Sequence, residues 1–105
     1  MGKNNEPVKQ PLEDTINSDV FKEEVKVWAE RIGVEYKSIQ LRAMKNKWGS
    51  CSSKGRLTFD KELLKQPASF RAKIIAHELL HLKIPHHGKL FESILRSYLS
   101  KYGHF

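Results

Sequence analysis

The chain has 105 residues, of which 30% are charged and 39% hydrophobic, and its net charge is +7 at neutral pH. This length predicts one small domain, and the composition is ordinary for a soluble protein. No apolar run approaches the ~20 residues of a membrane span, and residues 1–6 lack the apolar core of a signal peptide. Cys51 is the only cysteine, which excludes an intramolecular disulfide and favours a cytoplasmic location.

The positive charge solubilises the surface and also favours acidic protein segments, anionic membrane surfaces or nucleic acid as partners. The densest basic group contains Arg42, Lys45 and Lys47, and Trp48 follows it directly. Base stacking combined with positive charge is a common mode of nucleic-acid contact. Nucleic-acid binding is therefore one alternative function for this chain.

Residues 1–17 contain Pro7, Pro11 and little apolar content, which predicts a flexible or extended N-terminal arm. Residues 18–105 form the predicted domain. Its first helix should begin at Ser18 or Asp19 as N-cap and end at Gly33. The apolar residues of this helix recur at helical spacing and should face the core: Phe21, Val25, Trp28, Ala29 and Ile32.

The apolar period changes to two within residues 34–44, and short strands are also predicted at 48–51 and 56–60. Turn residues separate these strands, so the sequence predicts a small, mainly antiparallel three-stranded sheet. Two more helices are predicted over residues 67–82 and 88–102. The apolar face of the last one should contain Leu90, Phe91, Ile94, Leu95, Tyr98 and Leu99. The predicted fold class is therefore α+β, with three helices and one small sheet.

The most specific motif is HELLH at residues 77–81, within the second predicted helix. Residues i and i+4 of a helix share one face, so His77 and His81 can direct two imidazoles at one metal ion. Glu78 lies beside the first ligand, where it can take a proton from metal-bound water. The apolar residues of this helix cluster on another face, so the histidines are not part of the core stripe.

A catalytic zinc ion usually has three protein ligands and one open position. Pro85 should end the helix and let the chain turn back, and His87 is the preferred third ligand. A zinc-stabilised binding module without catalysis is a second alternative, although a purely structural site has no use for Glu78. Cys51 is interpreted as a small, partly buried strand residue rather than as a ligand or nucleophile.

Several segments together resemble the YgjP-like and SprT-like zincin metallopeptidases: WGSCS at residues 48–52, LTF at 57–59, HELLHL at 77–82, His87 and Phe91. In its shortness the chain is most similar to the minigluzincins, which in turn resemble the catalytic domains of HtpX-type membrane peptidases. The resemblance covers about residues 18–100 and implies a zincin-like domain. The SprT-like part of it also supports the nucleic-acid alternative.

The resemblance implies a Zn²⁺-dependent endopeptidase in which a sheet strand lines the cleft and pairs with an extended peptide or protein substrate. It implies His77, His81 and His87 as metal ligands and Glu78 as general base. Two departures from the family pattern leave alternatives for the third ligand. His86 stands where many relatives have Asn, and Glu92 stands where many have Trp.

The C-terminal residues raise the question of latency. Gly103 permits a reversal of direction, His104 and a terminal carboxylate are competent zinc ligands, and Phe105 resembles a substrate side chain. The tail is either frayed and solvated or lies in the cleft and inhibits the enzyme. For the residue that stabilises the oxyanion, Tyr98, Tyr102 and a histidine all remain open.

Overall fold

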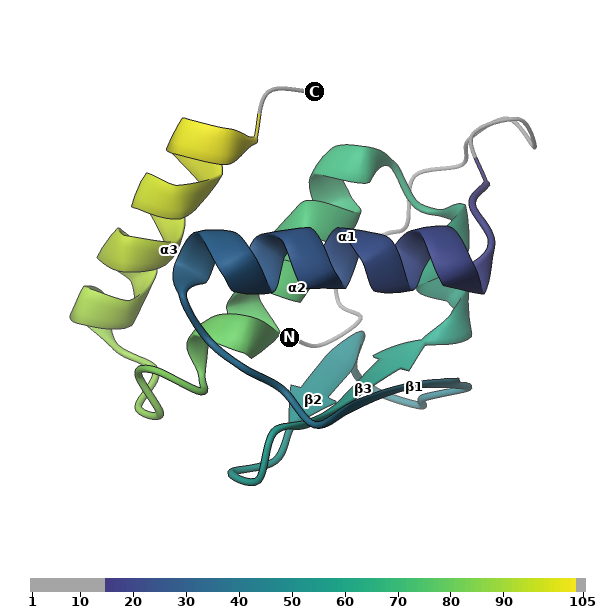
Figure 1. Ribbon diagram of the computed structural model, residues 1–105, viewed down its shortest axis with the longest axis horizontal. Helices are drawn as coiled ribbons and strands as arrows, with labels where there is room; N and C mark the ends of the chain where they lie inside the picture. The colour runs from purple at the N-terminus through teal and green to yellow at the C-terminus, as the bar shows by residue number, and fades with distance from the viewer. Residues whose placement is uncertain (1–14, 104–105) are drawn as a thin grey trace.

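The computed structural model of the chain describes residues 15–103 (Figure 1). Most of the predicted arm, residues 1–17, lies outside this range, although the Ile16 N–H donates to the Leu64 carbonyl at 3.1 Å. The elements follow in the order α1 (Ser18–Ile32), β1 (Ser38–Arg42), β2 (Gly49–Cys51), β3 (Arg56–Asp60), the 3-10 helix η2 (Lys61–Lys65), α2 (Ala68–Leu80) and α3 (Lys89–Tyr102). The three helices and the small sheet confirm the predicted α+β class. The sequence did not predict η2.

The three strands form a mixed sheet in the order β1-β3-β2. β2 pairs antiparallel with β3, but β1 pairs parallel with β3, with Ser38 opposite Arg56. The expectation of a mainly antiparallel sheet is therefore wrong for the longer of the two pairs. After β1 the chain does not turn back as a hairpin but crosses to the far edge, forms β2 there, and returns as the central strand. This crossing places β2 at an edge of the sheet.

The N-cap of helix α1 lies one residue before Ser18, the earlier of the two predicted N-caps. The N-cap is Asn17, whose side chain accepts a hydrogen bond from the Val20 N–H at 2.9 Å. The predicted C-cap is confirmed, because Gly33 adopts a left-handed conformation with φ of 81°. An ion pair joins α1 to α2: the Arg71 guanidinium donates two 2.9 Å hydrogen bonds to the Glu24 carboxylate. This bidentate pair fixes the position of α2 along α1.

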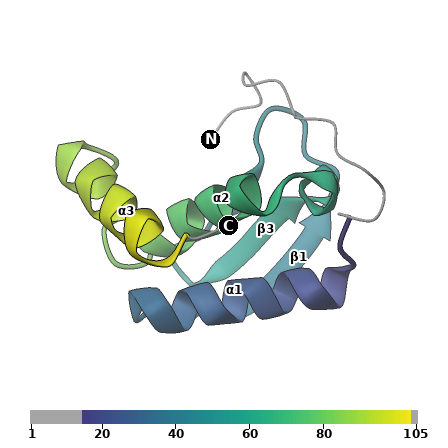
Figure 2. The same cartoon turned by 90° about the horizontal axis from the view of Figure 1, so that it is seen from above.

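Helix α2 is the central element, since it contacts α1, α3 and β2. Figures 1 and 2 show it lying over the sheet, with α1 alongside and α3 to one side. The predicted apolar stripe of α1 is buried, as are Leu57 and Phe59 of β3. Leu90 was predicted on the apolar face of α3 but is 66% exposed. None of the helices among residues 15–103 has the length and hydrophobicity needed to cross a membrane.

The end of α2 determines how the histidine motif is presented. The regular helix stops at Leu80, two residues before the predicted end, and tightens as the Leu82 N–H donates to the Leu79 carbonyl at 3.0 Å. His81 nevertheless keeps right-handed helical angles, φ −62° and ψ −22°. The spacing of four residues therefore still places His77 and His81 on one face.

Candidate metal and catalytic site

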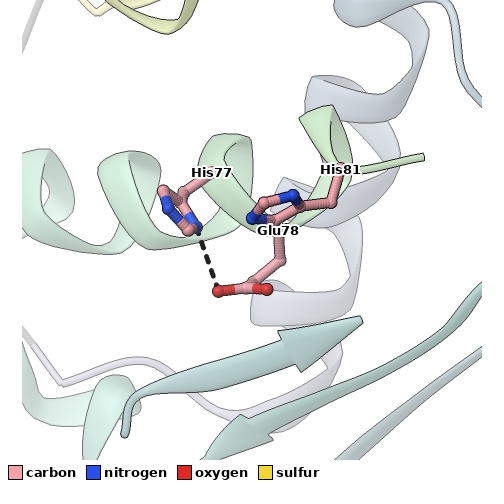
Figure 3. Close-up of side chains that lie close together, drawn as sticks. All are labelled: His77, Glu78 and His81. Atoms are coloured by element: carbon pink, nitrogen blue, oxygen red, sulfur yellow. Dashed lines mark hydrogen bonds and ion pairs between the residues drawn. The ribbon is translucent and has the colours of Figure 1, made fainter. Parts of the chain in front are cut away.

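The first two residues of the HELLH motif are buried and the last is half-buried. One potential ligand atom from each of His77, Glu78 and His81 lies within 4.8 Å of the other two. Figure 3 shows both imidazoles on the same stretch of α2, with the Glu78 carboxylate reaching toward the strands. Residues that sequence spacing assigned to one metal are thus close enough to share one.

Hydrogen bonds determine which imidazole nitrogens are available to a metal. His81 Nδ1 lies 3.2 Å from the Pro85 carbonyl oxygen, which can only accept, so Nδ1 carries the proton and Nε2 keeps its lone pair. His77 Nδ1 lies 3.1 Å from Glu78 Oε2, and donation to an ionised carboxylate likewise leaves Nε2 available. Two such Nε2 atoms at helical spacing fit a zinc ion.

The protonation state of His81 also favours metal binding. Burial lowers the pKa of His81, and its neighbour His77 lowers this pKa further. A lowered pKa keeps the imidazole neutral near pH 7, and only the neutral form coordinates a metal.

A third histidine ring lies next to this pair. The ring centre of His87 is 5.1 Å from that of His77 and 6.0 Å from that of His81. The fully buried Phe91 packs against all three, with ring centres 5.1 Å, 4.5 Å and 4.8 Å from His77, His81 and His87. Phe91 therefore supports the whole histidine cluster. The sequence placed it on the apolar face of the last helix, but no sequence signal assigned it this contact.

The imidazole of His87 pairs with the carboxylate of Glu92. Its Nε2 lies 2.7 Å from Glu92 Oε1, and the two side chains are 50% and 48% exposed. Donation to the carboxylate leaves Nδ1 of His87 with its lone pair. The group of ligand atoms within 4.8 Å of one another comes from His77, Glu78 and His81 and does not include His87. The His87 ring is therefore near the two motif histidines without completing a group of four within this distance. His86 is exposed, and its ring takes part in none of the ring contacts found among residues 15–103.

The motif opens onto a cleft of about 520 Å³ between β2 and the end of α2. Its walls are formed by Lys47, Gly49, Ser50, Cys51, Ser52 and Ser53 on the strand side and by His77, Glu78, His81, Leu82 and Pro85 on the helix side. A second pocket of about 360 Å³ is lined by His77, His81, His87 and Glu92, among others. The two motif histidines thus lie between a cleft that contains Glu78 and a pocket that contains His87.

Gly49 allows the edge strand to approach the proposed base. A Cβ atom at this position would lie 3.1 Å from Glu78 Cγ and 3.1 Å from the Phe59 ring. Both distances are tighter than ordinary van der Waals contact, so any larger residue here would require Glu78 or Phe59 to shift by a few tenths of an ångström. The WGSCS segment contains this glycine, but its role depends on a contact with a residue 29 positions later.

Cys51 does not have the properties of a nucleophile. Burial, together with the negative charge of Glu78, raises the pKa of Cys51 to about 11. Its Sγ donates to the Ser52 carbonyl at 3.4 Å. A thiol that stays protonated near pH 7 is neither a good nucleophile nor a good metal ligand. This agrees with the interpretation of Cys51 as a partly buried strand residue.

Two aromatic interpretations from the sequence change with the structure. Trp48 is 2% exposed and packs edge-on against Phe70, with ring centres 5.2 Å apart, so it cannot stack on a nucleobase. This removes the stacking argument for nucleic-acid binding. The Tyr98 hydroxyl lies 3.5 Å from the Ile32 carbonyl, and Tyr102 packs on Trp28. Neither tyrosine lines the cleft, so neither is placed to stabilise an oxyanion there.

A small α+β domain that presents an HExxH helix to a cleft beside a sheet edge has the layout of a metallopeptidase. Comparison with protein families agrees: the family described as "YgjP-like, metallopeptidase domain" matches residues 3–104, and the chain belongs to this family. A comparison with curated proteins gave no match.

Among solved structures, the chain is similar to one described as the "metallopeptidase zymogen of Pyrococcus abyssi abylysin". The two chains are 22% identical, the TM-score is 0.65, and the match covers 72% of this chain and 76% of the other. At this identity the likeness supports the fold. Together with the family match, it confirms the resemblance to small YgjP-like metallopeptidases that the sequence motifs indicated.

Proposed function

We propose that this protein is a zinc-dependent endopeptidase, with His77, His81 and His87 as metal ligands and Glu78 as general base. The observation that carries the proposal is the pairing of two available imidazole Nε2 atoms with a buried carboxylate on one wall of an open cleft. Family membership makes a peptide or protein the expected substrate. The buried Trp48 leaves the nucleic-acid alternative without its stacking argument.

Zinc, when bound, supplies the positive charge that lowers the pKa of the attacking water and polarises the substrate carbonyl. Glu78 then accepts the proton of this water and passes it to the leaving amine. Glu78 as a residue is 3% exposed and its carboxylate lies beside His77, so bulk water competes little for that proton. Among residues 15–103, β2 has a sheet neighbour on one side only, so its other edge can pair with an extended substrate along the cleft.

Metal-dependent hydrolysis tests this function directly. The zinc-loaded chain should cleave casein or a mixed peptide library at internal bonds, lose this activity with a chelator, and regain it when zinc is restored. A folded, zinc-loaded chain that hydrolyses no peptide would refute the proposal. It would leave a zinc-stabilised binding module as the remaining alternative.

Substituting Gly49 by Ala should impair catalysis more than metal binding. The added Cβ must displace Glu78 by a few tenths of an ångström, and small misplacements of catalytic groups are costly. We expect kcat to fall about tenfold, with little change in KM or zinc content. Gly88→Ala is the matched control, because a Cβ at Gly88 meets nothing within 4 Å. Equal kcat in both variants would show that the close approach of β2 is not needed.

The proposal includes latency through the C-terminal tail, and the protein similar to this chain is itself described as a zymogen. Residues 104–105 lie outside the described range. In this proposal a tail that lies in the cleft would occupy the open zinc position or the substrate subsites, and would so inhibit the enzyme.

Removing Tyr102 to Phe105 should therefore raise peptidase activity and leave zinc binding unchanged. Peptide cleavage and zinc content, measured on the same preparations of the full and the shortened chain, check this expectation. A shortened chain that stays folded and zinc-loaded yet is no more active than the full chain would rule out inhibition by this tail.

A further inference from the structure

Of the described residues on the strand side of the proposed catalytic cleft, one carries a charge. Lys47 lies there with Gly49, Cys51 and three serines, all of them small and uncharged. Lys47 is exposed, and no ion pair holds it among the residues that the structure describes. Its ammonium group is therefore free to interact with a molecule that enters the cleft.

The remaining charges of the cleft do not cancel that of Lys47. Glu78 is the only carboxylate among the lining residues, but it is buried and lies 3.1 Å from His77 Nδ1. Ser53 and Leu82 line both this cleft and a neighbouring pocket. The charged residues of that pocket are Lys54, Lys83 and Glu35. These three side chains still carry one net positive charge, but they lie in the neighbouring pocket, and Lys83 Nζ donates to the Ile32 carbonyl at 2.9 Å. Lys47 is therefore the cationic side chain of the cleft itself that is available to a substrate.

We propose that Lys47 makes this peptidase selective for substrates with Asp or Glu about two residues from the cleaved bond. The inference rests on the proposed function and adds a substrate class to it. Lys47 precedes Gly49 by two residues, and Gly49 packs on Glu78. Lys47 lies just before β2, with a bend at Trp48 between them. Two residues of extended chain span at most about 7 Å, so a substrate extended along β2 can reach Lys47 within about two residues of the position beside Gly49.

The selectivity should be modest, because Lys47 is exposed and its charge is screened by solvent. An exposed ion pair typically changes an equilibrium by up to about fivefold. We expect kcat/KM to be about fivefold higher for a Glu peptide than for its Gln counterpart at low salt. The preference should shrink as ionic strength rises, since salt screens charges that are separated by solvent.

The test uses the zinc-loaded full chain and matched peptides in which Glu, Gln or Lys is placed in turn at the positions around the cleaved bond. Lys47→Gln should remove the Glu preference at one of these positions, and Lys47→Glu should replace it with a preference for Lys. Lys45→Glu is the matched control, since Lys45 is also exposed, lies two residues away and does not line the cleft. This control variant should keep the Glu preference.

Two results would overturn the inference: equal cleavage of Glu and Gln peptides by the wild-type chain, or an unchanged preference in Lys47→Glu. A failure of the proposed function is distinguishable, because then no peptide is cleaved. In that case the affinity of the chain for labelled Glu and Gln peptides, followed by fluorescence anisotropy, decides the matter. Tighter binding of the Glu peptide that disappears in Lys47→Gln supports the role of Lys47, and equal or absent binding refutes it.

Discussion

Replacing Glu78 by Gln is expected to lower the rate of peptide hydrolysis by about a thousandfold while zinc stays bound. The amide has nearly the same shape as the carboxylate, so it fills the same buried space beside Gly49. It cannot accept a proton, however, so water is no longer activated and the leaving amine is no longer protonated. Since His77, His81 and His87 remain, the proposed donor set for zinc is unchanged.

Zinc content and peptide cleavage, measured on the same preparations, check this expectation. Glu62→Gln serves as control, because Glu62 is an exposed residue whose carboxylate pairs with Lys65 at 3.9 Å, away from the cleft. The control should match the wild-type chain in both measurements. If the Glu78→Gln variant hydrolysed casein as fast as the wild-type chain, another residue would have to be the base.

The closeness of His77 and His81 could be predicted from the sequence because its geometry is local. A spacing of four residues places His77 and His81 on one helix face whatever the rest of the fold does. The buried face of α1 could be predicted for the same reason. The helical period alone places Phe21 and Val25 on one face and their polar neighbours on the other.

The sheet could be predicted only in part. Alternating residues locate a strand but do not name its partner, so the parallel pairing of β1 with β3 had no sequence signal. The edge position of β2 follows from that pairing, and with it the whole strand side of the cleft. Gly49, Lys47 and Phe91 therefore acquired their proposed or observed roles only when distant segments were brought together.

Three residues are candidates for the third zinc ligand: His87, Glu92 and His86. Substituting each of them tests which one binds the metal. His87 lies beside the motif histidines and Glu92 lies behind it, which is the arrangement of a metal-binding histidine held by a carboxylate. His86 is exposed and outside the ring cluster. We therefore expect His87 to bind zinc through Nδ1, the ring nitrogen that Glu92 leaves available.

Zinc affinities of three variants, measured by competition with a chromophoric chelator, separate the candidates. His87→Ala removes a ligand and should weaken zinc binding about a thousandfold, because the metal's binding energy is shared among few donors. Glu92→Gln loses only the support behind His87 and should weaken it about 10- to 100-fold. His86→Ala should have no effect and is the matched control.

The opposite ranking would identify a different site. If Glu92→Gln lost zinc a thousandfold while His87→Ala lost little, Glu92 would be the ligand and His87 its support. The absorption spectrum of the cobalt-substituted chain gives a second readout that does not depend on hydrolysis. A ligand substitution should change the spectrum of the bound cobalt, whereas loss of the supporting group should change its affinity and leave the spectrum nearly intact, because the donor atoms stay the same.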